Sequence, residues 1–228
     1  VLSLNGIPVV AIELKNQFTG QDINDSIEQW KSNRNPKEPL FHFDNRILAY
    51  FGCDLYEAAM ATELKGEKTF FMPFNQGSNG AGEVGGSGNP QRDDDEYVTS
   101  YFWKDVLRRD VLLAILQRFI MRQEETTISL IQDKHGKEKE ISETKTKIIF
   151  PRYHQLDVVE KLIRDTEANG SGTNYLIQHS AGSGKSNSIA WLTYRLASLH
   201  NKDNANIFKG VFVVTDRRVL NRQLQETI

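Results

Sequence analysis

The chain has 228 residues, 39% hydrophobic and 25% charged, which is enough to bury a core and unlike the composition of a disordered chain. Its 28 basic and 30 acidic residues leave a net charge of −2, which excludes a uniformly basic nucleic-acid coat but not a local basic cleft. A single cysteine, Cys53, excludes a disulfide framework, and no apolar run reaches the about 18 residues of a membrane span, so we expect a cytoplasmic protein without a membrane partner.

The N-terminal part of the chain predicts strands around one helix. It begins in a strand-like pattern, from which we expect a fragment. Asn5-Gly6 predicts a hairpin turn between strands at 1–4 and 7–15, because both turn positions require a positive φ. Residues 22–32 predict a short helix. Its apolar stripe consists of Ile23, Ile27 and Trp30. Aromatic and branched residues predict further strands at Phe41, Phe43, 47–51 and 69–74.

The middle of the chain is less regular. Residues 75–90 are rich in glycine and predict a flexible loop, and four acids follow at 93–96. Apolar residues at helical spacing over 100–121 predict one long helix or two short ones. Residues 128–149 predict a charged β-hairpin around His135-Gly136 that connects the two regions carrying motifs.

After Pro151 the pattern changes to alternating helices and strands. Helices are predicted at 155–168, 186–199 and 217–227, and short apolar strands at 175–178 and 211–214. Such alternation is typical of a parallel α/β sheet.

The sharpest motif is the stretch 175–186, in which an apolar strand enters a glycine-containing turn before a helix. Gly182 and Gly184 let the backbone approach phosphate oxygens. Lys185 can reach the β- and γ-phosphates, and Ser186 can bind Mg²⁺. His179 stands where the strict pattern has glycine, and a glycine-rich turn with an incidental lysine is the alternative.

A glutamine upstream of this loop suggests nucleotide recognition. The sequence Arg152-Tyr-His-Gln155 begins a predicted helix, and the Gln155 amide has the paired donor and acceptor that can bind the edge of adenine. The alternative is a polar residue at a helix N-terminus.

A carboxylate and a lysine end the strand at 7–15. Glu13 and Lys15 lie two residues apart and therefore share one face of a strand. A carboxylate can hold Mg²⁺, and a lysine beside it can orient water and stabilise phosphate charge. The alternative is an exposed ion pair. The pattern resembles the PD-(D/E)xK nucleases, although residues 1–12 contain no second acid.

The order of the motifs is more specific than any one of them. The series is E-x-K (13–15), F-F-M-P-F-N (70–75), Y-F-W-K-D-V-L-R-R-D (101–110), R-Y-H-Q (152–155), H-S-A-G-S-G-K-S (179–186) and V-V-T-D-R-R-V-L-N-R-Q (213–223). It resembles the restriction (R) subunit of type I restriction–modification enzymes over nearly the whole chain.

The resemblance implies an α/β protein in which a restriction-endonuclease-like mixed sheet precedes the first part of a RecA-like P-loop domain. The nuclease domain would cover 1–122, a connector 123–150 and the start of the motor lobe 151–228. The implied activity is ATP-dependent translocation of double-stranded DNA followed by Mg²⁺-dependent cleavage. The implied partners are DNA and the methyltransferase (M) and specificity (S) subunits.

The resemblance also assigns residues. Nuclease catalysis would use Glu13, Lys15 and Gln29, with Glu13 and the Leu14 backbone carbonyl on the metal and the second acid just before Val1. ATP would be bound by Arg152, Gln155, Ala181, Gly182, Ser183, Gly184, Lys185 and Ser186, with Ser186 on its Mg²⁺.

Other functions remain open. The chain could belong to a superfamily 2 helicase-like ATPase, or to a nucleotide-gated DNA-binding module, in either case with a non-catalytic N-terminal domain. Under the main hypothesis the 228 residues alone are expected to be inactive, because the Walker B acids and the second motor lobe with its arginine lie outside them.

Overall fold

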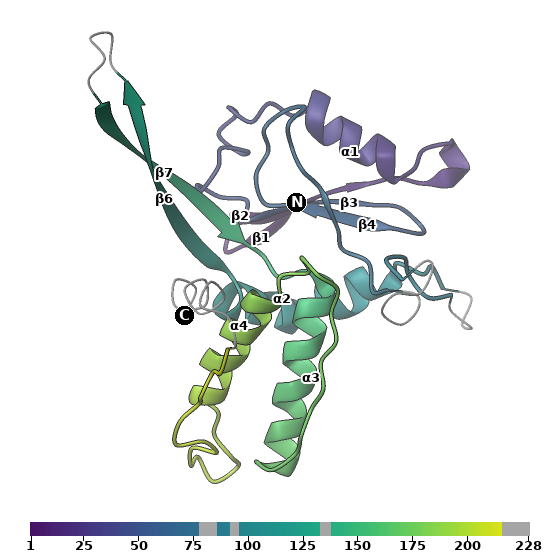
Figure 1. The fold of residues 1–228 in the computed structure, drawn as a ribbon. Helices are drawn as coiled ribbons and strands as arrows, with labels where there is room; N and C mark the ends of the chain where they lie inside the picture. Colours follow the sequence, from purple (N-terminus) through teal and green to yellow (C-terminus); the bar gives the residue numbers. More distant parts are fainter. Residues whose placement is uncertain (78–85, 92–95, 133–137, 216–228) are drawn as a thin grey trace.

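The structure is a computed structural model that describes residues 1–77, 86–91, 96–132 and 138–215 (Figure 1). Its N-terminal part is a five-stranded mixed sheet, which confirms the expected α/β class and the mixed sheet. The strands, in spatial order, are β1 (Leu2–Leu4), β2 (Ile7–Leu14), β3 (Ala49–Cys53), β4 (Ala58–Ala61) and β5 (Met72–Pro73). Only β2 and β3 pair in parallel.

The predicted hairpin at the start of the chain is confirmed. Asn5 and Gly6 have φ angles of 50° and 82°, and β1 and β2 pair antiparallel on either side of them. These angles are those of the two-residue turn that matches the twist of paired strands.

The predicted helix is α1 (Ile23–Ser32), which crosses over from β2 to β3. Asp22 caps it by accepting hydrogen bonds from the backbone N–H groups of Asn24 and Asp25. The predicted stripe is wrong at one position, because Ser26 rather than Ile27 is fully buried with Ile23 and Trp30. A small side chain is required there, since Ser26 faces Gly52 of β3.

The other predicted strands are partly wrong. The strand predicted at 47–51 is β3, two residues later, and only Met72–Pro73 of 69–74 is a strand. Phe41 and Phe43 lie outside any strand, and Phe41 packs its ring against Trp30 instead. Strand β4 was not predicted, because its run of alanine and methionine lacks a β-branched or aromatic signal.

The two faces of the sheet are covered differently. Helix α1 covers one face, where Ala11, Trp30 and Tyr50 form a small cluster. The main core covers the other face and reaches into the C-terminal helices, with Phe51, Phe102 and Trp191 in one continuous cluster. Along β3, Ala49, Phe51 and Cys53 pack into the main core and Tyr50 packs into the small cluster, because successive side chains of a strand point to opposite faces. This core contains residues from both sides of the predicted connector.

The region predicted as one long helix or two short ones, residues 100–121, contains two short helical segments. A π-helical turn, η2 (Phe102–Val106), precedes α2 (Arg109–Arg118). They are separated at Arg108, whose ψ of 139° is extended.

The predicted hairpin is longer than expected and projects from the rest of the molecule (Figure 1). Its strands are β6 (Met121–Gln132) and β7 (Glu138–Ile149), paired antiparallel along their whole length. The predicted turn at His135-Gly136 lies outside the described residues, as do half of the glycine-rich loop (78–85) and three of the four acids (93–95).

Two of the C-terminal helices are confirmed and pack side by side: α3 (Tyr153–Asn169) and α4 (Lys185–Ala197) (Figure 1). The strands predicted at 175–178 and 211–214 are wrong, because neither pairs with a neighbour within the described part of the chain. Leu176 is 95% exposed and Phe212 93%. A strand is defined by hydrogen bonds to a second strand, so the described residues after 150 contain no parallel sheet. The helix predicted at 217–227 lies outside them.

Among the described residues, none of the helices is both long enough and apolar enough to cross a membrane.

Candidate functional site

The structure brings the three predicted nuclease residues together. Glu13 ends β2, Lys15 follows it, and the backbone N–H of Lys15 donates to the carbonyl of Cys53 at 2.9 Å, which extends the pairing with β3. Lys15 Nζ donates to Gln29 Oε1 of α1 at 2.6 Å and lies 3.6 Å from Glu13 Oε1. The Lys15 side chain is only 8% exposed, so its ammonium group is held in place between an amide and a carboxylate.

Arg34 completes this cluster and was not predicted. Its Nη2 lies 3.3 Å from Glu13 Oε2, and its guanidinium lies over the Trp30 ring, 5.9 Å from the centroid. Ser26 Oγ also donates to the Glu13 backbone carbonyl at 3.1 Å. No motif marks Arg34, because its role arises only when the segment after α1 folds back over β2.

The cluster does not by itself fit a complete Mg²⁺ site. The described residues contain no group of three or more His, Cys, Asp or Glu side chains that could hold a metal ion. Glu13 already uses one oxygen for Lys15 and the other for Arg34. Mg²⁺ prefers octahedral coordination by oxygen, and Glu13 with the Leu14 carbonyl supplies too few ligands. The chemistry that the cluster can perform unaided is the stabilisation of an anion by Lys15 and Arg34.

The second predicted site is the loop before α4. Gly182 and Gly184 have φ angles of 72° and 79°, a conformation that glycine adopts without strain. Gly184 is the residue before Lys185, the first residue of α4. Lys185 Nζ donates to the carbonyls of His179 at 3.1 Å and Ser180 at 2.8 Å, so the lysine folds over the loop.

This loop fits a nucleotide phosphate group. The first N–H groups of a helix, here those of Lys185 and Ser186, have no intrahelical acceptor, and the helix dipole favours an anion there. Ala181 and Gly182 are exposed, whereas Ser183 is buried. Three buried polar atoms beside the loop have no hydrogen-bond partner in the described structure: Arg152 Nε, His179 Nδ1 and Ser183 Oγ. The site thus combines backbone N–H groups that can bind an anion with buried side-chain polar atoms that have no partner in the described structure.

Gln155, predicted to bind adenine, contacts the backbone of the phosphate loop. It is 3% exposed. Its Nε2 donates to the carbonyls of Gly184 at 2.9 Å and Ser183 at 3.3 Å, and its Oε1 accepts from the backbone N–H of Arg152 at 2.9 Å. The residues predicted to bind ATP, from Arg152 to Ser186, therefore lie close together. The side-chain amide of Gln155 is hydrogen-bonded to backbone groups of the protein.

Two histidines, neither predicted as a ligand, lie beside the same loop. The ring of His154 contacts that of His179 edge to face, with centroids 4.9 Å apart, and His154 Nε2 lies 2.9 Å from the Ser183 carbonyl oxygen. Burial lowers the pKa of both imidazoles, and the ammonium of Lys185 lowers the pKa of His179 further. Both rings therefore favour the neutral form. The position of His179 within the motif was a visible signal that it would lie here.

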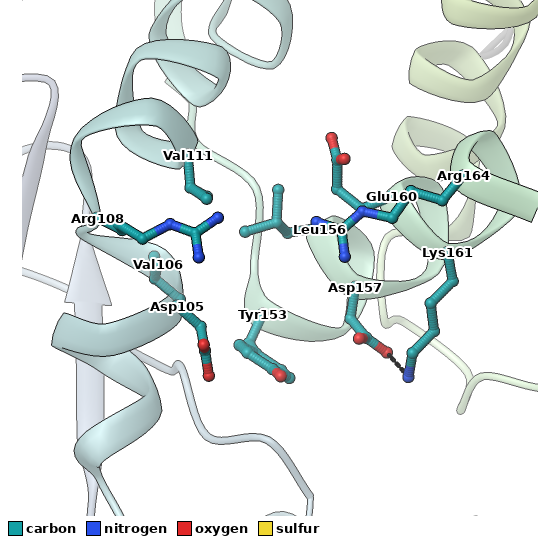
Figure 2. A pocket seen from close by; sticks show the side chains of 10 residues that line it. All are labelled: Asp105, Val106, Arg108, Val111, Tyr153, Leu156, Asp157, Glu160, Lys161 and Arg164. Atoms are coloured by element: carbon teal, nitrogen blue, oxygen red, sulfur yellow. Dashed lines mark hydrogen bonds and ion pairs between the residues drawn. The ribbon is translucent and has the colours of Figure 1, made fainter. Parts of the chain in front are cut away.

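A separate charged cleft lies between the η2–α2 segment and α3 (Figure 2). Its volume is about 230 Å³, and it contains none of the predicted site residues. Its charged and polar lining includes Asp105, Arg108, Tyr153, Asp157, Lys161 and Arg164. Arg108 is paired with Asp110 outside the cleft and Lys161 with Asp157, so the positive charges are largely compensated locally.

The segment that contains the phosphate loop is similar to a family of ATPases. The family model described as SWI2/SNF2 ATPase matches residues 154–228, which include α3, the loop and α4. The C-terminal part of the chain is therefore ATPase-like.

Two curated relatives cover the whole chain. The endonuclease subunit of the type I restriction enzyme MjaVIIIP from Methanocaldococcus jannaschii is 27% identical over 232 residues, 100% of this chain and 19% of that protein. The endonuclease subunit of MjaVIIP from the same organism is 28% identical over 231 residues, 99% of this chain and 18% of that protein. No solved structure matches at a significant level. The resemblance expected from the motifs is thus confirmed, and the chain spans less than a fifth of these relatives.

Proposed function

We propose that this chain is part of the motor and nuclease subunit of a type I restriction enzyme, which translocates double-stranded DNA at the expense of ATP and then cleaves it. The observation that supports this most is the phosphate loop at the N-terminus of α4, inside the residues matched by the ATPase family. The same chain carries the cluster of Glu13, Lys15 and Gln29 at the end of β2.

Nucleotide binding would use the loop as it stands. The backbone of residues 181–184 would surround the phosphates, and Lys185 would exchange its two carbonyl partners for the β- and γ-phosphate oxygens. Ser186 would bind the Mg²⁺ that accompanies ATP, and the Arg152 guanidinium would supply a further positive charge. Magnesium neutralises phosphate charge when bound.

DNA cleavage would use the positive groups of the first cluster. Lys15, fixed by Gln29, would stabilise the negative charge that develops on the phosphate. Metal dependence is part of this proposal only through the resemblance to PD-(D/E)xK nucleases, and Mg²⁺ would need carboxylates in addition to Glu13. We place the nuclease domain at 1–122, the connector at 123–150 and the motor lobe from 151, acting in the cytoplasm with the M and S subunits.

A specific observation favours a second candidate function. Because the described residues offer Glu13 as the one carboxylate of the cluster, the N-terminal domain could be non-catalytic. The protein would then be a helicase-like ATPase or a nucleotide-gated DNA-binding module.

The test uses the full-length subunit assembled with its M and S partners. Lys185→Ala is expected to abolish ATP hydrolysis and cleavage together, and Lys15→Ala to abolish cleavage while ATP hydrolysis stays near the wild-type rate. Lys202→Ala, which removes an exposed lysine, is the matched control and should change neither activity. Undiminished cleavage by Lys15→Ala would reject the nuclease site and favour the second candidate.

A further inference from the structure

We propose that Arg34 is an internal counter-ion that closes the Glu13 carboxylate to divalent cations, so that the cluster as folded is a resting state of the nuclease site. The inference rests on the proposed nuclease function of this cluster and deepens it, because it explains why the cluster does not fit Mg²⁺ as it stands. The contact between Arg34 and Glu13 is therefore autoinhibitory.

Both oxygens of the Glu13 carboxylate face a positive group. Lys15 Nζ lies 3.6 Å from Oε1, and Arg34 Nη2 donates to Oε2 at 3.3 Å. The Glu13 side chain is only 18% exposed, so water screens these charges less than at an open surface. A divalent cation that approaches Glu13 meets two positive charges and one negative charge, and it is repelled until one of the positive groups leaves.

Lys15 is held too firmly to be the group that leaves. Its side chain is almost fully buried, and its Nζ donates to Gln29 Oε1 at 2.6 Å. Glu13 is fixed as well, since its backbone pairs with β3 and its carbonyl accepts from Ser26 Oγ at 3.1 Å. A rearrangement that frees the carboxylate must therefore come from Arg34.

Arg34 can leave Glu13 more easily. Its side chain is 38% exposed, and it lies beyond the last residue of α1 instead of within the helix. It donates to Glu13 through Nη2, without the two parallel bonds of a bidentate pair. Its guanidinium also lies over the Trp30 ring, a cation–π contact that does not depend on Glu13. The side chain therefore keeps a place beside the site when the carboxylate is released.

The first experiment measures binding of Mn²⁺, used in place of Mg²⁺, to the full-length subunit without nucleotide or DNA, from the EPR signal of the free ion. Arg34→Gln is expected to bind Mn²⁺ about tenfold more tightly than the wild type, because the metal no longer competes with a charged hydrogen bond. Arg34→Lys keeps the charge and should stay close to the wild type. Arg46→Gln, which removes an exposed arginine between α1 and β3, is the matched control and should equal the wild type.

A double variant shows whether the gain acts through Glu13. Glu13→Gln removes the carboxylate, and in that background Arg34→Gln should give no gain in Mn²⁺ affinity. An equal gain with and without the carboxylate would mean that Arg34 acts only as a nearby positive charge, and the proposal would be wrong.

Amide hydrogen exchange of residues 33–38 tests the displacement itself. If Arg34 ties this segment to Glu13, exchange in the wild type should become faster when Mn²⁺ is added, although a bound ligand usually slows exchange. In Glu13→Gln the exchange should already be fast without metal and should not respond to Mn²⁺. Slower or unchanged exchange in the wild type on saturation with Mn²⁺ would contradict the release of Arg34.

Cleavage by the assembled enzyme separates the two possible failures. If Arg34→Gln still cleaves DNA but binds Mn²⁺ no more tightly than the wild type, the proposal alone is rejected. If the wild type and Arg34→Gln neither bind Mn²⁺ through Glu13 nor cleave DNA, the proposed nuclease function is rejected as well.

Discussion

Lys15 and Gln29 are joined by a hydrogen bond of 2.6 Å between Nζ and Oε1, although one follows β2 and the other lies on α1. The amide has no charge, so it fixes the ammonium group of Lys15 without neutralising it. Together with Glu13 at 3.6 Å, it determines where the positive charge at the end of β2 is placed.

Removal of this amide should therefore impair cleavage. Gln29→Ala is expected to lower the cleavage rate of the assembled enzyme by about 10- to 100-fold, the range for loss of a hydrogen bond to a charged group. ATP hydrolysis, measured in parallel, should be unchanged. Glu28→Ala, an exposed position on the same helix, is the control, and an equal loss with that variant would point to disruption of α1.

Arg34 should matter for the same cluster. Arg34→Ala frees Glu13 Oε2 and removes a positive charge near the expected phosphate, so cleavage should fall by about tenfold by loss of electrostatic stabilisation. Arg34→Lys keeps the charge and should restore part of the rate. Cleavage assays with both variants check this, and wild-type cleavage by Arg34→Ala would exclude a role for the guanidinium.

The contact between α1 and β3 allows no larger side chain at position 52. A Cβ atom there would lie 2.5 Å from Ser26 Oγ and 3.3 Å from Ile23 Cδ1. Gly52→Ala is expected to lower the free energy of unfolding by about 1–3 kcal/mol through overpacking, as measured by urea denaturation. Gly210→Ala is the control, since its Cβ would meet no atom within 4 Å, and it should leave the midpoint unchanged.

Asp54 connects the start of α1 to the turn between β3 and β4. Its carboxylate accepts from the backbone N–H groups of Ile23, Tyr56 and Glu57 at 2.7–2.8 Å. Asp54→Ala leaves these donors unpaired and should cost about 2–4 kcal/mol of unfolding free energy. Asp110→Ala, at a fully exposed carboxylate, should change it little. A small effect at Asp54 would mean that water replaces its bonds.

Stability should depend on pH through the two histidines beside the phosphate loop. Their pKa values are lowered in the folded protein, so below about pH 6.5, the pKa of an unperturbed histidine, the unfolded chain binds more protons. The free energy of unfolding should therefore fall as the pH is lowered from 7.5 to 5.5. Thermal unfolding of His179→Asn should show a weaker pH dependence than the wild type, and His42→Asn, an exposed histidine, the same dependence.

Much of the candidate sites could be predicted because their signals are local. Asn5-Gly6 sets the register that brings Glu13 and Lys15 onto the face covered by α1, and the glycines at 182 and 184 shape the loop before Lys185. The strands at 175–178 and 211–214 were predicted from apolar runs alone. They are unpaired in the described structure because a strand needs a hydrogen-bonded neighbour, which composition does not supply.

The sequence by itself determined the backbone conformations that depend on a few adjacent residues: the first hairpin turn, the capped start of α1 and the turn before α4. Only the tertiary structure decided which side chains meet there. Arg34 reaches Glu13, and Gln155 reaches the carbonyl of Gly184, across 21 and 29 residues of chain. The physical reason is that turn and helix preferences are properties of neighbouring residues, whereas the partner of a buried amide or carboxylate is set by how whole elements pack.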